Sequence, residues 1–551
     1  MSKLALQPHP RLKRPKGPVL VVVMDGVGLG PGDEYDAVAQ ATMPTLERLL
    51  SDRTHSMRLK AHGTAVGLPS DDDMGNSEVG HNALGSGRIV MQGAGLVDRA
   101  LKDGSIFEGP GFKALHDAFS TGGTFHVIGL LSDGGVHSRL NQILGVVEGA
   151  AARGARRIRL HVLADGRDVP DGSFTRYLAE LEDHLKGLAT RGVDAKVASG
   201  GGRMVVTMDR YESDWRIVER GWRAHVHGDE RRFPSATAAA LAFREETPGI
   251  SDQQLPAFVV EEGGAPVGPI IDGDAVLLAN FRGDRALQVT RAFEDDAFDK
   301  FDRGRRPKVV YAGMMEYDGD LHLPGRFLVA PPQIERTSGE YLAAMGIRTF
   351  ACSETQKYGH VTYFWNGNRS GRFDDTLETY LEIPSNAPPF QERPEMKAAE
   401  IAGAAIDAIG SGRFDLVRIN FANGDMVGHT GELAPTIKAC EAVDAALARL
   451  LAAVENAGGI AVVTADHGNA DDMAQRDKKG APLKDAQGRV LPRTSHTLAP
   501  VPFCLTGPGL SVSVRLRSDV PSPGLANIAA TVMNLLGFAA PADYEPSLLA
   551  E

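Results

Sequence analysis

Five short motifs, divided between the two ends of the chain, contain side chains that could bind metal ions and act as a nucleophile. They supply the candidate residues Asp25, Ser77, Asp425, His429, Asp466, His467 and His496. Carboxylates and imidazoles in this number suit a pair of divalent transition-metal ions. Ser77 lies in the segment DDDMGNSEVGH, and its hydroxyl could be the nucleophile that such ions activate. The pattern predicts a two-metal site with a serine nucleophile.

Each of these residues also has an ordinary structural interpretation. Asp425 and His429 are four residues apart, a spacing that places two polar side chains on one side of a helical turn whether or not they bind metal. Ser77 could be the N-cap of a helix, a position that serine favours. A helix N-terminus also stabilises phosphoryl groups through its backbone N–H groups, so the two roles of Ser77 are compatible. The combination of the motifs favours the metal site.

Short β-branched runs precede most of these motifs. The predicted strands are residues 19–26, 125–135, 158–168, 275–285, 308–314, 416–425 and 460–469. Between several of them apolar residues recur with helical spacing, most clearly in residues 437–459, where Gly458 and Gly459 end the predicted helix. Its predicted apolar face is formed by Ile437, Cys440, Val443, Leu447, Leu450 and Val454. This alternation predicts an α/β fold with parallel sheets covered on both faces, in which ligands bind at the carboxyl ends of the strands.

The middle of the chain has a different set of polar residues, rich in arginine at the ends of predicted strands. The candidate residues for binding an anion are His137, Arg167, Asp168, Arg203, Arg210, Arg282 and Arg285. Guanidinium groups match phosphate and carboxylate oxygens, which indicates a small anionic substrate. Surface ion pairing is the commoner role of an arginine, but these arginines flank Gly-rich strand ends. Lys357, in SETQKYGH, is a further candidate as a movable positive charge.

The distribution of motifs predicts two domains, as expected for a chain of 551 residues. If the two ends of the chain complete one site, the middle must be an inserted domain. The Gly-rich segment 92–98 and the Pro-containing segment 329–340 are the candidate junctions. We therefore predict a metal-binding domain of residues 1–92 and 332–551, and an inserted substrate domain of residues 93–331. The polar segment 472–497 is expected to be a surface loop.

Charge and composition exclude several classes of protein. The chain has 59 Lys and Arg against 71 Asp and Glu, a net charge of −12, which argues against a nucleic-acid or anionic-membrane partner. No apolar stretch approaches the roughly 18 residues of a membrane span, and the run after the basic N-terminal arm is too short for a signal peptide. The cysteines Cys352, Cys440 and Cys504 are far apart and are expected to be buried thiols in a reducing compartment. A cytoplasmic protein is the simplest expectation.

Nine motifs occur in an order that resembles the cofactor-independent phosphoglycerate mutases of the alkaline phosphatase superfamily. They are DGVG, MGNSEVGH, SDGGVHS, DGRD, NFRGDR, ETQKYGHVTYFWNGN, NGDMVGH, DHGN and SHT. The resemblance extends from about residue 18 to residue 540. Val27 in place of the usual Trp, DDDM before Gly75 and the long loop before His496 resemble the plant and trypanosomatid branch. The resemblance implies an alkaline-phosphatase-like parallel-sheet domain with a second α/β phosphotransferase domain inserted in it.

The resemblance also implies a role for each candidate residue. One Mn²⁺-type ion would be bound by Asp425, His429 and His496, and the other by Asp25, Ser77, Asp466 and His467, with Mg²⁺ or Co²⁺ as alternatives and no need for bisphosphoglycerate. Ser77 would become phosphoserine while 3-phosphoglycerate and 2-phosphoglycerate are interconverted in glycolysis and gluconeogenesis. Asp168 would exchange protons, and Lys357 would neutralise charge. The anion-binding candidates of the middle region, together with Lys357, would bind this small-molecule substrate, and a monomer is expected.

Three other functions share part of the pattern. A metal-dependent phosphomonoesterase of the same superfamily would use the same metal-binding residues but would release phosphate to water. The middle region with His137, DGRD and NFRGDR argues against it, because a simple hydrolase has no need to hold a dephosphorylated glycerate. A non-catalytic protein that uses the metals structurally would tolerate the loss of Ser77. A phosphopentomutase fits the substrate motifs poorly.

Overall fold

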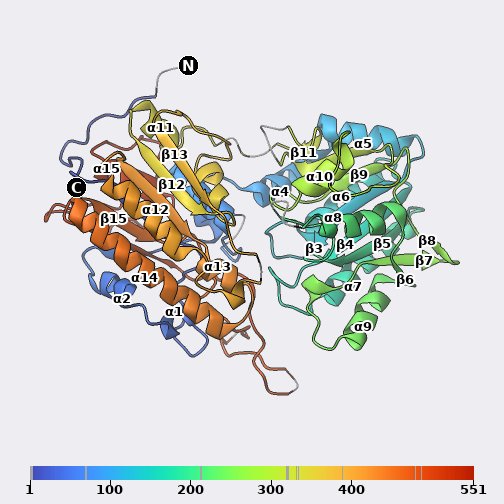
Figure 1. Ribbon diagram of the computed structural model, residues 1–551. Coiled ribbons are helices and arrows are strands. Elements are labelled where there is room, and N and C mark those ends of the chain that lie inside the picture. The colour runs from blue at the N-terminus through green and yellow to red at the C-terminus, as the bar shows by residue number, and fades with distance from the viewer. Residues whose placement is uncertain are drawn as a thin grey trace. The chain divides into compact units, whose positions relative to one another are not determined.

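A computed structural model describes residues 4–68, 71–210, 214–317, 322–330, 332, 334–387, 389–477, 479–485 and 487–550. The chain forms two compact units. Unit 1 consists of Met1–Gln92 and Gln333–Glu551, and unit 2 of Gly93–Pro332. In Figure 1 unit 2 carries the colours from light blue to yellow-green, and unit 1 the dark blue and the yellow to red segments. The functional division between them stays a prediction.

Unit 1 is built on a seven-stranded sheet in the order β13-β12-β14-β1-β15-β16-β2. Its strands are β1 (Val19–Met24), β2 (Ser56–Leu59), β12 (Thr349–Glu354), β13 (Glu378–Ile383), β14 (Leu416–Phe421), β15 (Ile460–Thr464) and β16 (Val501–Thr506). The central strand β1 pairs in parallel with β14 and β15, while β16 and β2 continue the sheet antiparallel. Every residue of β1 is buried, which explains its unbroken apolar sequence.

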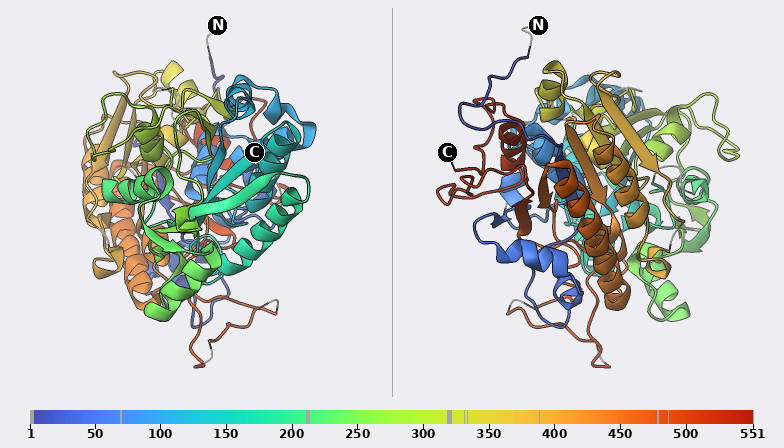
Figure 2. Two further views of the ribbon diagram at one scale, coloured as in Figure 1. Left: turned by 90° about the vertical axis from the view of Figure 1, so that its right-hand side faces the viewer. Right: turned by 60° about the vertical axis from the view of Figure 1, so that its left-hand side comes forward.

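Helices of unit 1 pack on this sheet and connect its strands. They are α1 (Ala37–Gln40), α2 (Pro44–Ser51), α3 (Ser77–Ser86), α11 (Ser338–Ala344), α12 (Ala398–Gly410), α13 (Asn423–Gly428), α14 (Leu433–Ala457) and α15 (Asn527–Leu535). Helices α12 and α14 lie side by side (Figures 1 and 2). The predicted helix is confirmed as α14, which begins at Leu433 rather than Ile437 and ends at the predicted Gly458, where φ is 70°. Its predicted face is buried except for Ile437, which is partly buried.

Unit 2 contains a nine-stranded sheet in the order β11-β10-β9-β3-β4-β5-β7-β6, with β8 paired to β7. The strands are β3 (Phe125–Leu131), β4 (Arg157–Ala164), β5 (Asp194–Gly202), β6 (Arg231–Phe233), β7 (Phe258–Glu262), β8 (Ala265–Pro266), β9 (Ala275–Leu278), β10 (Val310–Met315) and β11 (Phe327–Val329). The helices are α4 (Gly93–Asp103), α5 (Pro110–Ser120), α6 (Leu140–Ala152), α7 (Phe174–Ala189), α8 (Trp215–Trp222), α9 (Ala236–Glu246) and α10 (Leu287–Glu294). Strands β10, β9, β3, β4 and β5 are parallel.

The sheet of unit 2 is covered on both faces. Along β9, Leu277 packs in one apolar cluster, whereas its neighbours Val276 and Leu278 pack in another. Because successive side chains of a strand point to opposite faces, the two clusters fill opposite sides of the sheet. The predicted α/β class is therefore confirmed, with sheets that are mostly parallel but mixed. All the predicted strands occur, although several end earlier than predicted because their last polar residues form turns or, after β14, the start of the helix α13.

Two smaller predictions from the sequence are also confirmed. The three cysteines are free and buried. Of the predicted surface loop 472–497, the described residues between Ala474 and Pro492 form a projecting loop, seen at the bottom of Figures 1 and 2 and held by the bridges Ala474–Pro492, Arg476–Pro482 and Lys484–Val490. Near the two ends of the predicted segment, Asp472 and His496 are buried instead of lying on the surface. Among the described residues, no helix is both long and apolar enough to cross a membrane.

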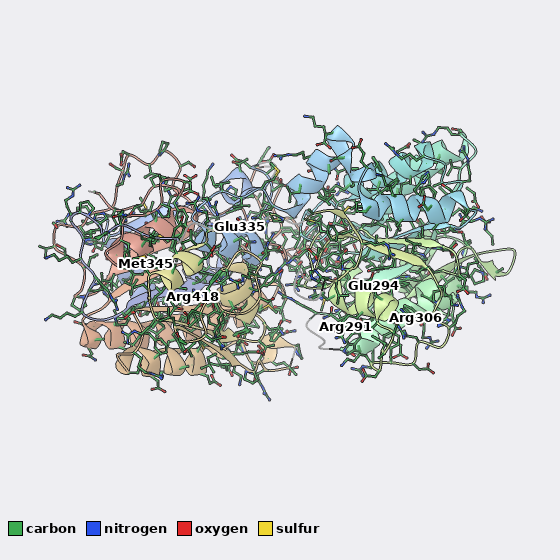
Figure 3. All side chains as sticks on the ribbon, turned by 90° about the horizontal axis from the view of Figure 1, so that it is seen from above. Arg291, Glu294, Arg306, Glu335, Met345 and Arg418 are labelled. Atoms are coloured by element: carbon green, nitrogen blue, oxygen red, sulfur yellow. The ribbon has the colours of Figure 1, made fainter. Side chains whose placement is uncertain are left out.

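A buried arginine joins β14 to the segment that follows β12. Arg418, labelled in Figure 3, is 1% exposed, and its Nε donates to the carbonyl oxygen of Val361 at 2.8 Å. Val361 belongs to the π-helical turn η5 (His360–Phe364). The guanidinium also lies over the ring of Trp365, 5.4 Å from its centroid. These contacts fix η5, and with it the neighbouring Lys357, against the central strands.

Glu354, the last residue of β12, is expected to make the stability of unit 1 depend on pH. Its side chain is buried, and burial raises its pKa from 4.5 to about 7. The folded state therefore keeps a proton that the unfolded state releases, so the free energy of unfolding falls as the pH rises from about 4.5 to about 7. The total decrease is roughly 3 kcal/mol.

Glu354→Gln should remove this decrease, because glutamine does not titrate. We expect the urea midpoint to fall less in the variant than in the wild type between about pH 5 and about pH 8. Glu382→Gln, which alters an exposed glutamate on the neighbouring strand β13, should behave like the wild type. Equal decreases in wild type and Glu354→Gln would show that Glu354 is ionised in the folded protein at both pH values.

Candidate active site

Three adjacent parallel strands of unit 1 deliver acidic and imidazole side chains to their carboxyl ends. Asp25 directly follows β1, and Asp466 and His467 follow β15 after one further residue. Strand β14 is followed by the short helix α13, which contains Asp425. Carboxyl ends of parallel strands share one edge of a sheet, and this topology brings together residues more than 400 positions apart in the sequence.

Ser77 is the first residue of α3 and is not the residue that caps it. The neighbouring Asn76 is the N-cap, and its side-chain oxygen accepts from the backbone N–H groups of Glu78 and Val79, each at 3.1 Å. The helix can approach the segment that follows β15 closely because residue 80 is glycine: a Cβ there would lie 2.7 Å from the carbonyl oxygen of Asp466. The Ser77 hydroxyl is thus left available for chemistry at a buried helix N-terminus.

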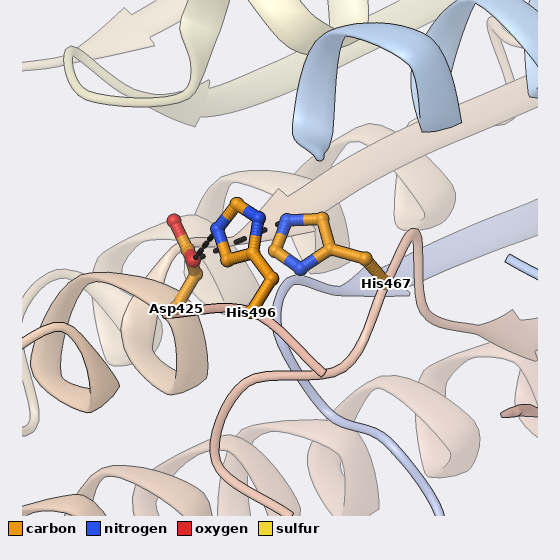
Figure 4. A group of neighbouring side chains, drawn as sticks. All are labelled: Asp425, His467 and His496. Atoms are coloured by element: carbon orange, nitrogen blue, oxygen red, sulfur yellow. Dashed lines mark hydrogen bonds and ion pairs between the residues drawn. The ribbon is translucent and has the colours of Figure 1, made fainter. Parts of the chain in front are cut away.

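The first group of ligand-type atoms comprises Asp425, His429 and His496. The Nε2 atoms of His429 and His496 lie 3.0 Å and 3.1 Å from Oδ1 of Asp425, and 3.0 Å from each other. Figure 4 shows Asp425 with His496 and with His467, whose Nε2 is 3.9 Å from the same oxygen. The i and i+4 spacing of Asp425 and His429 therefore places the two ligand-type side chains next to each other.

The second group comprises Ser77, Asp25, Asp466 and His467. Ser77 Oγ lies 3.2 Å from Oδ1 of Asp25 and 3.0 Å from Nε2 of His467. The same imidazole nitrogen is 3.5 Å from Asp25 and 3.6 Å from Oδ2 of Asp466. His467 takes part in both groups, because Asp425, His467 and His496 can also surround one ion.

Backbone carbonyls set the tautomers of the three imidazoles. Nδ1 of His429 lies 2.6 Å from the carbonyl oxygen of Thr494, and Nδ1 of His496 lies 2.8 Å from that of Gly75. Nδ1 of His467 is 3.2 Å from its neighbour's carbonyl oxygen. A carbonyl accepts only, so each Nδ1 carries the proton and each Nε2 presents a lone pair to the ligand group.

The donors fit divalent ions in both type and spacing. Ligand atoms lie about 2.0–2.2 Å from such an ion, so neighbouring ligand atoms are separated by about 3.0–3.6 Å, as they are in both groups. Mixed imidazole and carboxylate donors suit ions such as Mn²⁺, Zn²⁺ and Co²⁺. Asp466 Oδ2 is buried and makes no hydrogen bond among the described residues, which leaves it available as a ligand.

Lys357 carries a positive charge at the centre of these groups. Its ammonium donates to Asp25 Oδ1 and Asp425 Oδ2, each at 2.7 Å, and to Ser77 Oγ. Burial, followed by the charge of Asp466, raises the pKa of Asp25 to about 6. Three buried carboxylates against one ammonium leave an excess of negative charge, and divalent cations would compensate it.

In unit 2 the candidate anion-binding residues gather around Asp284. Nε of Arg210 lies 3.1 Å from Asp284 Oδ2, and Nε of Arg282 lies 3.3 Å from Oδ1. Nδ1 of His137 is 3.6 Å from Oδ1. Although burial alone would raise the pKa of Asp284, the surrounding positive charges hold that pKa below its usual range. Asp284 therefore orients this group as a buried anion.

A second acidic pair holds Arg203. This arginine is 1% exposed and donates to Asp165 Oδ1 at 2.7 Å and to Asp168 Oδ2. Burial opposes ionisation of Asp168, but the charges of Arg203, His137 and Arg167 outweigh it and lower the pKa of that carboxyl. Burial and the charges of Arg203 and Arg167 lower the pKa of Arg285. The seven predicted residues of the middle region therefore belong to one electrostatically coupled cluster, in which an added anion would relieve repulsion among the arginines.

Several residues of these sites were missed by the sequence analysis. Asp165 and Asp284 are the buried counter-charges of the arginines, and both lie inside motifs that were recognised for their arginines. Asn420 donates to Asp25 Oδ2 at 2.7 Å, and Asn469 donates to Asp425 Oδ1 at 2.9 Å. Their proximity to the ligand motifs was the available signal, but an asparagine in a strand, such as Asn420, or in a loop, such as Asn469, has many other uses.

Comparison with known proteins places the chain in a family. Residues 17–540 match the model of the metalloenzyme superfamily. The chain is 59% identical over 548 residues to the 2,3-bisphosphoglycerate-independent phosphoglycerate mutase of Trypanosoma brucei brucei, covering 99% of both chains. It is 58% identical over 549 residues to a probable enzyme of the same description from Arabidopsis thaliana, covering 99% of this chain and 97% of the relative.

A solved structure extends the likeness to three dimensions. The crystal structure of Leishmania mexicana phosphoglycerate mutase at low cobalt concentration matches with a TM-score of 0.96 and 60% identity, covering 99% of this chain and 100% of the other. Identity of this level over the full length shows the family as well as the fold. The chain therefore belongs to the 2,3-bisphosphoglycerate-independent phosphoglycerate mutases, within the metalloenzyme superfamily.

Proposed function

We propose that this chain interconverts 3-phosphoglycerate and 2-phosphoglycerate, in glycolysis and gluconeogenesis, through a phosphoserine on Ser77. The observation that carries this proposal is the environment of the Ser77 hydroxyl. It lies at a helix N-terminus, within 3.2 Å of Asp25 and 3.0 Å of His467, and it accepts from the ammonium of Lys357. A serine used only for capping would have no reason to face three ionisable groups.

Two divalent ions fit the ligand groups. Asp425, His429 and His496 would hold one ion, and Ser77, Asp25, Asp466 and His467 the other. When bound, the ions supply positive charge that lowers the pKa of the serine hydroxyl and neutralises the phosphoryl oxygens. We propose Mn²⁺ as the metal, because a mixture of imidazole nitrogens and carboxylate oxygens suits it, with Co²⁺ and Mg²⁺ as alternatives.

The protein's own residues would carry out the two phosphoryl transfers. Ser77 Oγ attacks phosphorus, the bond to the substrate's 3-oxygen breaks in line, and Lys357 neutralises charge on the transferring group. The 2-hydroxyl of the retained glycerate then attacks the phosphoserine, and Ser77 Oγ leaves. Asp168 would give a proton to the departing 3-oxygen and take one from the attacking 2-hydroxyl. Its lowered pKa would rise towards this role when an anion offsets the charge of Arg203.

The arginine cluster would keep the glycerate from escaping between the two transfers. Its guanidinium groups are buried, and buried carboxylates orient them in advance. Such preorganised donors bind a carboxylate without reorganising. A phosphomonoesterase would need no such cluster, because its product is released and water completes the reaction.

The decisive experiment measures mutase activity after the metal has been removed and returned. Chelated protein should be inactive with 3-phosphoglycerate, and Mn²⁺ should restore formation of 2-phosphoglycerate without added bisphosphoglycerate. Co²⁺ and Mg²⁺, tested in parallel, would rank the metals. Phosphate release without 2-phosphoglycerate would identify a phosphomonoesterase instead. A requirement for bisphosphoglycerate would exclude the phosphoserine route.

We further propose that the protein acts as a monomer in the cytoplasm on this small-molecule substrate, without a nucleic-acid or membrane partner. The net charge of −12 and the buried, unpaired thiols support this proposal.

A further inference from the structure

A continuous chain of hydrogen bonds crosses the interior of unit 2 and ends beside the arginine cluster. It begins at Asp274, whose Oδ2 lies 3.1 Å from Nε2 of His126. His126 Nδ1 is 2.9 Å from Nε2 of His161, and His161 Nδ1 is 2.7 Å from the Ser199 hydroxyl. The chain then continues through two contacts of His225: Nδ1 is 2.7 Å from Ser199 Oγ, and Nε2 is 2.8 Å from the hydroxyl of Thr207.

The four central members of this chain are supplied by the strands β3, β4 and β5 and by the π-helical turn η3 (Arg223–His227), whereas Asp274 directly precedes β9 and Thr207 lies in the loop after β5. A β-bulge between Leu160 and His161 shifts the register of β4 against β5, so that His161 lies opposite Ser199. A β-bulge changes the direction of the side chains next to it and locally interrupts the regular hydrogen bonding between the strands. Each member from Asp274 to Thr207 is at most 2% exposed, so water does not compete for these hydrogen bonds.

The direction of every hydrogen bond follows from Asp274. Its carboxylate also accepts from the backbone N–H groups of Thr124 at 2.7 Å and Ile271 at 2.9 Å, and it is therefore an acceptor towards His126. His126 must then carry its proton on Nε2 and accept at Nδ1, and His161 must do the same. Ser199 donates to His161 and accepts from Nδ1–H of His225. His225 Nε2 consequently has a lone pair, and Thr207 donates to it.

Thr207 needs such an anchor because its backbone is strained. Its φ is 71°, in the left-handed region that β-branched residues rarely adopt. The backbone N–H of Thr207 donates to the carbonyl oxygen of Ile217 at 2.8 Å. Residue 221 is glycine and leaves room for the Thr207 side chain, because a Cβ at residue 221 would lie 2.2 Å from the Thr207 hydroxyl oxygen. The native conformation of this turn is therefore imposed by its surroundings.

The turn connects directly to the candidate substrate-binding arginines. Arg203 and Arg210 flank it in the sequence. The carbonyl oxygen of Met208, one residue after Thr207, accepts from Nη1 of Arg285 at 2.8 Å. A change in the backbone at Thr207 would therefore move or release guanidinium groups that come from two different segments of unit 2.

We propose that Thr207 is a positioning residue for the arginine cluster, held in its strained conformation by the directed hydrogen-bond chain from Asp274. This inference rests on the proposed function, in which these arginines hold the phosphoglycerate. Thr207 touches no substrate in this role. It acts through the backbone that carries Arg203, Arg210 and the acceptor of Arg285.

Thr207→Val is the main test, because valine keeps the shape of threonine and removes the hydroxyl. We expect the KM for 3-phosphoglycerate to rise about tenfold, the equivalent of one buried hydrogen bond, while kcat changes less than about twofold. Thr207→Ser restores the donor and should restore the KM. Ser199→Ala, which interrupts the chain away from the turn, should raise the KM in the same direction by about threefold.

A matched control is Thr290→Val. Thr290 is also a buried, hydrogen-bonded threonine of unit 2, on α10, but it contacts Ala286 and Tyr311 rather than the chain. It should leave the KM unchanged even if it lowers the thermal midpoint as much as Thr207→Val does. An equal rise in KM for both valine variants, or a KM that stays high in Thr207→Ser, would reject the positioning role and show that Thr207 contributes only to the stability of the protein.

The direction of the chain can be tested separately by nitrogen-15 NMR of histidine-labelled protein. His126 and His161 should each be protonated on Nε2, and His225 on Nδ1, with the Nε2 resonance of His225 shifted in Thr207→Val. Protonation of His225 on Nε2 would overturn the proposed direction. This measurement does not depend on activity, whereas the absence of mutase activity in the wild type would reject the proposed function itself.

Discussion

Replacing Ser77 by alanine should abolish mutase activity while leaving the fold and the metal content largely intact. We expect kcat to fall at least about 10⁴-fold, as when the nucleophile of a serine enzyme is removed. Asn76 caps α3 and Ser77 does not, so the helix keeps its N-terminal hydrogen bonds in the variant. The remaining donors Asp25, Asp466 and His467 can still hold an ion. Coupled assays, metal analysis and thermal melting measure the three quantities.

The natural control for this variant is Ser86→Ala at the other end of α3. Ser86 is equally buried, and its hydroxyl donates to the carbonyl oxygen of Arg88 at 2.9 Å. Ser86→Ala should keep its mutase activity within about twofold of the wild type, even if it lowers the stability of the protein. Mass spectrometry of acid-quenched wild type with substrate should find phosphate on Ser77. Substantial mutase activity in Ser77→Ala would exclude the phosphoserine mechanism and favour a structural use of the metals.

Asp425→Asn is expected to have the second largest effect, because Asp425 contacts more members of the site than most of its neighbours do. Its Oδ1 lies within 3.1 Å of His429 and His496, and its Oδ2 accepts from Lys357 at 2.7 Å. Asparagine keeps the shape but removes the charge that binds a cation. We expect one ion per chain to be lost and kcat to fall at least about 10³-fold.

Asp415→Asn provides a matched control, because Asp415 precedes the same strand β14 that Asp425 follows. It is a buried carboxylate of unit 1 that pairs with Arg348 at 2.8 Å, at the opposite end of the strand. This variant should lose stability but retain the metal content and kcat of the wild type. Two ions per chain in Asp425→Asn, measured after dialysis against metal-free buffer, would remove Asp425 from the proposed ligands.

Much of the fold was predictable because its signals are local. The seven apolar runs became strands, since a strand that is buried on both faces needs apolar residues at every position. The end of α14 followed from Gly458, which adopts the left-handed conformation at low cost. By contrast, Ser77 could be interpreted as an N-cap, because Asn76 and Ser77 have similar capping preferences. The backbone decided between them.

The arginines show the limit of local signals most clearly. Arg203 and Arg282 were recognised by type, but their buried partners Asp165 and Asp284 were not, because a sequence does not indicate which aspartate faces which guanidinium. Thr207 gave no signal at all: its positive φ is held by contacts with Ile217 of α8 and His225 of η3, and a local sequence pattern does not show that these elements fold back onto it.

The sequence by itself determined the chemistry available to this protein: the ligand types, the serine, the arginines and the strands that precede them. Residue type and spacing carry this information because metal binding and strand formation depend on side-chain chemistry and local periodicity. Only the tertiary structure decided which atoms meet. The order of parallel strands brings Asp25, Asp425 and His467 to one edge of a sheet, and the carbonyls of Thr494 and Gly75 point the Nε2 lone pairs of His429 and His496 inward. Those contacts join residues hundreds of positions apart, and their distances depend on the packing of the whole unit.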